Sequence, residues 1–195
     1  MDLSPYRHRQ ALDRQAPAAS RIIVVMGISI DEINRSSVER FVELLGGIFE
    51  RSPWVPELVY PERPFESGAE LHRAMAAAVR RAPEVHRMEL LCSHPELAGR
   101  EASEGTLTDE SKREQAGAGL NQCSAEELAK IKSLNQAYHS KFGFPFIIAV
   151  TGLDKYQIIA SMENRLDNPE QLEFDTAIGE VEKIACIRID ALIDE

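Results

Sequence analysis

The sequence lacks the cysteine content of a disulfide-stabilised protein or of a cysteine-bound metal protein. It holds three cysteines in 195 residues, Cys92, Cys123 and Cys186, and no Cys-x-x-Cys motif. A disulfide framework uses an even number of cysteines in a small, cysteine-dense chain, and a zinc site needs cysteines at paired spacing. We therefore expect three free thiols in a reducing, cytoplasmic compartment, and no metal site.

Long apolar runs and an excess of basic residues are also missing. The longest apolar run covers only residues 22–28, whereas a membrane-spanning helix needs about 20 apolar residues. Lysine and arginine number 22 against 32 aspartates and glutamates, which gives a net charge of −10. Nucleic-acid binding needs a basic surface that displaces counterions. These two absences exclude a membrane partner and a nucleic-acid partner.

What the sequence does contain suits one folded domain with a short appendage. Hydrophobic residues make up 44% of the chain, a normal share for a globular protein, and the length is enough for one core. Residues 1–25 mix arginine with proline and alanine without a helical period. We expect a flexible N-terminal extension over residues 1–25, with Met26 as an alternative start, and a helical domain over residues 26–195.

Helical periodicity runs through almost the whole chain from Ser36 onward. Ser36 and Glu39 have the spacing of a capping box, and apolar residues at positions 41, 44, 45, 48 and 49 predict a helix that ends before Ser52. Residues 144–150 are the one extended run, and a single strand builds no sheet. Further helix starts are predicted at Ser67, Pro83, Thr108, Ser124, Asp154 and about Glu170. The predicted fold is all-α, a compact multi-helix bundle of about seven to nine helices with little or no sheet.

Arg188 lies on the apolar face of the last predicted helix, four residues after Ile184 and four before Leu192. A guanidinium stays charged in proteins, so a buried one needs an anion. Arg188 therefore forms a buried ion pair with a helix carboxylate, extends its stem to solvent, or binds a carboxylate or ureide ligand at the floor of a pocket. Its position alone leaves these alternatives open.

Three polar residues share one face of the helix predicted after Thr108, because Ser111, Glu114 and Gln115 are spaced i, i+3 and i+4. Lys112 and Arg113 point elsewhere on the same helix. A hydroxyl, a carboxylate and an amide on one strip can bind a polar heterocycle by hydrogen bonds. Spacing alone favours an ordinary solvated face, which is the commonest place for such residues.

His94 comes directly before Pro95, at a point where a helix stops. It is either a structural hydrogen-bonding residue or a proton-transfer group, since histidine titrates near neutral pH. Residues 142–148 form an extended wall that is either core or a backbone offering N–H and C=O groups to a ligand. The chain has no Gly-rich phosphate loop and no Gly-x-Ser-x-Gly motif. The remaining histidines are expected on the tail or on helix surfaces; they are His8, His72, His86 and His139.

Together these segments resemble the family of 2-oxo-4-hydroxy-4-carboxy-5-ureidoimidazoline (OHCU) decarboxylases, the last enzymes on the route from urate to (S)-allantoin. The resemblance runs from about Ile30 to Ile193 and depends on the order and spacing of six motifs. Glu96 stands where the family usually has aspartate, and residues 1–25 have no counterpart. The motifs are Phe-Val-x-x-Leu-Gly-Gly-Ile-Phe-Glu-x-Ser-Pro-Trp-Val (41–55), Arg-Pro-Phe (63–65), His-Pro-Glu-Leu-Ala-Gly (94–99), Ser-x-x-Glu-Gln-x-x-Ala-Gly-Leu (111–120), Asn-x-x-Tyr-x-x-x-Phe-Gly-Phe-Pro-Phe-Ile (135–147) and Ile-Ala-x-Ile-Arg (184–188).

The resemblance implies an all-helical homodimer that acts on a small ureidoimidazoline without a metal or an organic cofactor. It implies that His94, Glu114 and Arg188 are catalytic, with His94 transferring protons, Glu114 assisting and Arg188 holding ureido or ring oxygens. It also implies a set of substrate-binding residues, which are Pro95, Ser111, Lys112, Arg113, Glu114, Gln115, Phe146, Ile147, Ile148, Ala149 and Val150.

Two other functions compete with the decarboxylase. The first is a helical adaptor whose pocket has lost catalysis, which the replacement of His94, Glu114 or Arg188 would favour; all three are present. The second is a hydrolase that opens the ring of the preceding intermediate in urate oxidation. It needs an activated water, which is compatible with the sequence.

Overall fold

The computed structural model describes residues 27–194, which form an all-α fold and confirm the predicted fold class. Within this range the one β-contact is an isolated bridge between Ile28 and Ile193. No helix in the same range is long and apolar enough to cross a bilayer. The predicted extension over residues 1–25 lies outside the described residues. The α-helices are α1 Ile30–Arg35, α2 Val38–Leu45, α3 Trp54–Val59, α4 Gly68–Arg81, α5 Glu84–Cys92, α6 Arg100–Glu104, α7 Asp109–Gly117, α8 Ala125–Phe142, α9 Lys155–Arg165 and α10 Glu170–Leu192.

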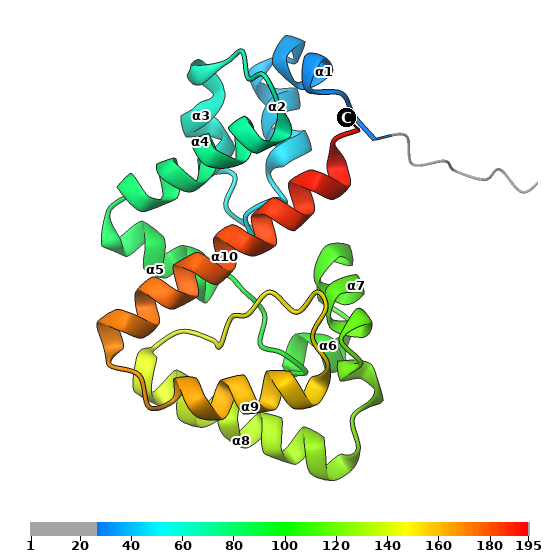
Figure 1. Cartoon of the computed structure of the whole chain (residues 1–195), viewed down its shortest axis with the longest axis vertical. Helices are drawn as coiled ribbons and strands as arrows, with labels where there is room; N and C mark the ends of the chain where they lie inside the picture. The colour runs from blue at the N-terminus through cyan, green and yellow to red at the C-terminus, as the bar shows by residue number, and fades with distance from the viewer. Residues whose placement is uncertain (1–26, 195) are drawn as a thin grey trace, which may run out of the picture.

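The long helix α10 organises the molecule. Figure 1 shows it running diagonally between two groups of helices, with α1 to α5 on one side and α6 to α9 on the other. It contacts α4 and α5 in the first group and α8 in the second. Its 23 residues extend about 35 Å. Both of its sides carry buried apolar residues, and these are Phe174, Ala177, Ile178, Val181, Ile184, Ala185 and Ile189.

Most of the predicted helix starts are confirmed, because capping is a local interaction. The Thr108 side chain accepts a hydrogen bond from the backbone of Ser111 at the start of α7. Ser124 and Asp154 each form a complete capping box, at the starts of α8 and α9. Ser67 also caps α4 as predicted.

The predicted cap at Ser36 is wrong, and so is the length of the helix that follows. Ser37 caps α2, whereas the Ser36 hydroxyl donates to the carbonyl of Ile33 and ends α1. Helix α2 stops at Leu45 because two consecutive glycines follow it, and each glycine in a helix interior costs about 1 kcal/mol. Residues 48 and 49 still reach the core, but from a series of turns.

The described part of the chain has ten α-helices, more than the predicted seven to nine, because three short helices were not recognised in the sequence. Helices α1, α3 and α6 have six residues or fewer. A helical hydrophobic period cannot be recognised over fewer than two turns. The three short helices lie in the segments that connect the predicted helices, so they leave the fold class unchanged.

The extended run over residues 144–150 is confirmed and lies buried between α8, α9 and α10. Arg165 on α9 donates from Nη1 to the carbonyl of Ile147 at 2.8 Å. The backbone N–H of Ala149 donates to Glu180 Oε2 on α10, also at 2.8 Å. Its backbone is therefore held by side chains of two helices instead of by a neighbouring strand.

Candidate active site

A small cavity lies where the loop after α5 meets α7, α10 and the extended run. Its volume is about 30 Å³, above the roughly 10–15 Å³ that a cavity needs to hold one water molecule. The lining residues are His94, Pro95, Leu97, Ser111, Glu114, Gln115, Phe146, Ile147, Ile148, Val150, Ile184 and Arg188.

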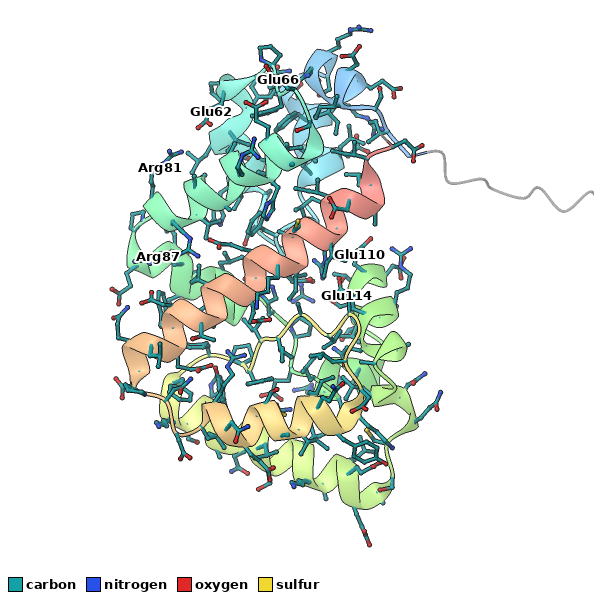
Figure 2. All side chains as sticks on the ribbon, in the orientation of Figure 1. Glu62, Glu66, Arg81, Arg87, Glu110 and Glu114 are labelled. Carbon is teal, nitrogen blue, oxygen red and sulfur yellow. The ribbon has the colours of Figure 1, made fainter. Side chains whose placement is uncertain are left out.

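The structure brings together the three residues that the resemblance implies are catalytic. His94 follows the end of α5, Glu114 lies on α7 and Arg188 on α10, and all three line the cavity. Figure 2 shows Glu114 on the side of α7 that is next to α10. The binding residues implied at positions 95, 111, 115, 146, 147, 148 and 150 line the same cavity.

Three of the residues implied to bind substrate do not line this cavity. Lys112 forms an ion pair with Asp109, and Arg113 forms one with Glu110, on the exposed side of α7. Each helical residue is rotated by about 100° from the one before it, so the two cations point away from Glu114. Ala149 is part of the extended run, but its N–H is directed to Glu180 and its side chain is not in the lining.

Arg188 is held by two carboxylates, the buried Glu50 and the partly exposed Glu114. Its Nε and Nη2 donate to the two oxygens of Glu114 at 2.8 and 3.0 Å, a bidentate pair. Its Nη1 donates at 3.0 Å both to Glu50 Oε2 and to the carbonyl of Gly47, and Nη2 also donates to Ser111 Oγ at 3.4 Å. All five N–H groups of the guanidinium therefore have acceptors. Of the alternatives for this residue, the buried ion pair is present.

The electrostatics of this pair keep Arg188 charged. Burial by itself lowers the pKa of Arg188, but the hydrogen bond and charge of Glu114, followed by those of Glu50, outweigh burial and raise it. The side chain of Arg188 is 5% exposed and that of Glu50 is 2% exposed. Buried charges are tolerated when they are paired and hydrogen-bonded, as these are.

His94 is buried and oriented by one backbone hydrogen bond. Its Nδ1 lies 3.0 Å from the carbonyl oxygen of Leu90, one turn back in α5. A carbonyl only accepts hydrogen bonds, so Nδ1 carries the proton, and the opposite nitrogen, Nε2, is the basic one when the ring is neutral. Burial lowers the pKa of His94, although the Leu90 hydrogen bond and the charges of Glu50 and Glu114 oppose this effect. The neutral ring is thus a base beside the cavity.

The rest of the polar face of α7 is buried, contrary to the solvated face that spacing alone favours. Ser111 Oγ donates to Glu50 Oε2 at 3.2 Å. Gln115 Oε1 accepts from the backbone N–H of Ala98 at 3.0 Å, which fixes the loop that follows His94. The face is buried because α10 and the extended run cover it.

Glu50 is the site residue that the sequence reasoning missed. It follows α2 in a turn, and its carboxylate is bonded to Ser111 and Arg188. Glu50 belongs to the first motif of the resemblance, and it directly follows the buried Ile48 and Phe49. A carboxylate next to two core residues was the available clue, but its partners lie 61 and 138 residues away in the chain.

The assembled groups can accept, hold and donate a proton beside the cavity. With a neutral His94, the charges of Glu50, Glu114 and Arg188 sum to −1. A basic imidazole nitrogen and a carboxylate next to a buried cavity are a common arrangement for general acid–base catalysis. Among residues 27–194, no group of histidine, cysteine, aspartate and glutamate is arranged to hold a metal ion.

Known proteins resemble this chain over nearly the whole described range. The family model for OHCU decarboxylase matches residues 34–190. The chain is 39% identical over 165 residues to the 2-oxo-4-hydroxy-4-carboxy-5-ureidoimidazoline decarboxylase of Halalkalicoccus jeotgali, which covers 85% of this chain and 92% of that one. It is 39% identical over 169 residues to the enzyme of the same name from Xenopus laevis, covering 86% and 97%. A crystal structure of (S)-allantoin synthase superposes with a TM-score of 0.68 at 30% identity, over 86% of this chain and 55% of that one.

Proposed function

Because this chain belongs to the OHCU decarboxylase family, we infer that it converts 2-oxo-4-hydroxy-4-carboxy-5-ureidoimidazoline into (S)-allantoin in the degradation of urate. The observation that carries this inference is the meeting of His94, Glu114 and Arg188 at one buried cavity. The two competing functions lack such support. An adaptor does not need these groups together, and the family model and the relatives reported above are named for the decarboxylase, not for a hydrolase.

The chemistry of the substrate explains why the proposed reaction requires no cofactor. The bond from ring carbon C4 to the carboxylate breaks and carbon dioxide leaves. The electron pair forms a C4=C5 double bond, while the π electrons of C5=N1 move to N1, which takes up one proton from solvent. The proton of the C4 hydroxyl then moves to C5, which leaves a C4 carbonyl. The ring itself accepts the charge, so no separate electron sink is required.

We propose that His94 moves the second of these protons. Its Nε2 is the basic nitrogen, so it accepts the hydroxyl proton and returns it to one face of C5, which produces a single enantiomer. Glu114 assists from α7 and is held in place by Arg188. Arg188 contributes its positive charge, and it binds a substrate oxygen only by exchanging one of its present partners.

The function is tested by circular dichroism with freshly generated product of urate oxidation. We expect the protein to produce the optical signal of (S)-allantoin faster than the spontaneous reaction, which gives a racemic mixture without signal. A racemic product at the spontaneous rate would contradict the decarboxylase and favour an adaptor. Rapid opening of the ring of the preceding intermediate would instead identify the hydrolase.

The acid limb of the pH profile is expected below pH 6.5. Burial lowers the pKa of His94 from 6.5, so the ring stays neutral, and active as a base, as the pH falls through that value. Activity is lost only at the lower pH at which the ring gains a proton. The measurement is kcat/KM across the acidic range, with far-UV circular dichroism at each pH to show that the fold persists. If activity is already lost at a pH above 6.5, the pKa of His94 is not lowered by burial as described.

We also propose that the protein is a homodimer, as the family resemblance implies. Size-exclusion chromatography with light scattering is expected to give twice the chain mass of 21.8 kDa. A mass of one chain at every protein concentration measured contradicts the homodimer.

We further propose a cytoplasmic location, supported by Cys92, Cys123 and Cys186 being free thiols. Residues 1–25 are proposed as an extension outside the catalytic domain, because the family match begins at residue 34.

A further inference from the structure

Glu50 lies directly behind the groups that line the cavity, and it is fixed at both ends. Its Oε2 accepts from Ser111 Oγ at 3.2 Å and from Arg188 Nη1 at 3.0 Å. Its own carbonyl accepts from the Ser52 hydroxyl at 3.0 Å in the turn after α2. Glu50 itself is 1% exposed and does not line the cavity. It therefore reaches the substrate only through Ser111 and Arg188.

A role in stability alone is a weak explanation for this carboxylate. Removing a carboxylate from water costs several kcal/mol, and a buried ion pair often contributes no more than a well-packed apolar pair of the same size. Arg188 already has a bidentate partner in Glu114. The second carboxylate gives the cluster a formal charge of −1, which adds to the cost of burial instead of reducing it.

Glu50 and Glu114 bind opposite parts of the same guanidinium. Glu114 takes Nε and Nη2, whereas Glu50 and the carbonyl of Gly47 take Nη1. Because the guanidinium is planar and rigid, fixing Nη1 also fixes the plane in which Glu114 receives its two hydrogen bonds. Without Glu50, the group can tilt about its bonds to Glu114, and Ser111 loses the acceptor of its hydroxyl.

We propose that Glu50 is a positioning residue of the decarboxylation, which holds Arg188 and Ser111 from behind the cavity and thereby fixes Glu114 relative to the substrate. This rests on the proposed function. The charge of Glu50 also acts on His94, together with the other two charged groups near that ring, Arg188 and Glu114. Glu50 and Glu114 favour the protonated ring, whereas Arg188 disfavours it. Loss of the charge at position 50 therefore makes His94 harder to protonate.

The main test is Glu50→Gln, which keeps the size of the side chain and removes its charge. We expect kcat to fall about 10- to 100-fold, the effect of misplacing a catalytic group by about 1 Å, with KM changed less than about twofold because Glu50 does not touch the substrate. The acid limb of kcat/KM is expected to move to lower pH. A residue that only stabilises the fold changes neither kcat nor this limb.

Glu182→Gln is the matched control. Glu182 is another largely buried glutamate in an ion pair, with Arg80, and it lies on α10 away from the cavity lining. We expect the control to retain the wild-type kcat and acid limb. Thermal unfolding of both variants, followed by circular dichroism, separates a loss of folded protein from a loss of turnover.

Glu50→Asp covers the case in which the glutamine variant does not fold. It keeps the charge but shortens the side chain by one methylene, so we expect a lower kcat with an unmoved acid limb. Wild-type kcat in a folded glutamine variant, or in the aspartate variant if only that one folds, overturns the proposal. If the wild-type protein itself forms no (S)-allantoin in the same assay, the proposed function fails instead.

Discussion

Replacement of His94 by alanine is expected to lower kcat for (S)-allantoin by about 10²- to 10⁴-fold, the usual contribution of a general acid–base residue. The variant should also lose enantioselectivity, because solvent then protonates C5 from either face. The fold is expected to persist, since His94 makes one hydrogen bond to a backbone carbonyl at the end of α5. The measurement is the initial rate of the circular dichroism signal of allantoin.

His139→Ala is the control for this variant. His139 is an exposed histidine in α8, away from the cavity, and its replacement should leave the rate and the optical signal unchanged. The His94→Ala variant should in addition lose the acid limb that we assign to this imidazole. Normal turnover with normal enantioselectivity would remove His94 from the mechanism.

The second large effect is expected on stability, from Glu173→Ala. Glu173 is fully buried at the start of α10 and accepts hydrogen bonds from Arg165 Nε at 2.8 Å and Asn168 Nδ2 at 2.6 Å. It also accepts from the hydroxyl of Tyr138. Burial, followed by this hydrogen bond, raises the pKa of Tyr138, so its phenol remains a donor. One carboxylate thus connects α8, α9 and α10.

Without Glu173, the largely buried cation of Arg165 loses its partner. Breaking a buried ion pair from one side costs about 3–5 kcal/mol, and we expect a loss of that size in the free energy of unfolding measured with urea. Activity should fall as well, because Arg165 holds the carbonyl of Ile147 in the cavity wall. The expected loss of stability is large because this ion pair is buried. Removing one partner of an exposed ion pair should therefore cost much less.

Glu163→Ala provides that comparison. Glu163 on α9 forms an ion pair with Lys130 in which both side chains are about half exposed, and exposed pairs contribute roughly 0–1 kcal/mol. The two variants remove the same side chain and differ in burial. If Glu173→Ala is no more destabilising than Glu163→Ala, the buried network does not join the three helices as described.

The sequence predicted those parts of the site that depend on neighbouring residues in the chain. Thr108 starts α7, and a helix that starts there places Ser111, Glu114 and Gln115 on one face. The same rotation places Lys112 and Arg113 on the outside, where the structure has them. The resemblance implied that all five residues from 111 to 115 bind substrate. Consecutive residues of a helix point in different directions, so only some of them face the cavity.

Sequence patterns could not identify the partners of the buried charges. Spacing identified Arg188 as a cation on an apolar face but left its anion open. The structure supplies Glu50 and Glu114, which are separated from it by 138 and 74 residues. Glu173 was missed for a different reason, because it lies in the first turn of a predicted helix, where acidic residues are ordinarily exposed.

By itself, then, the amino-acid sequence determined the fold class, most helix starts, the single face of α7 that Ser111, Glu114 and Gln115 share, and the family. Each of these depends on interactions within about one helical turn, or on motifs that keep their order along the chain. Only the tertiary structure decided that Glu50 lies behind Arg188, that Glu173 joins three helices, and that Ala149 turns away from the cavity. Those contacts arise from packing between distant segments, and the free energy of such packing depends on burial and geometry that no local pattern records.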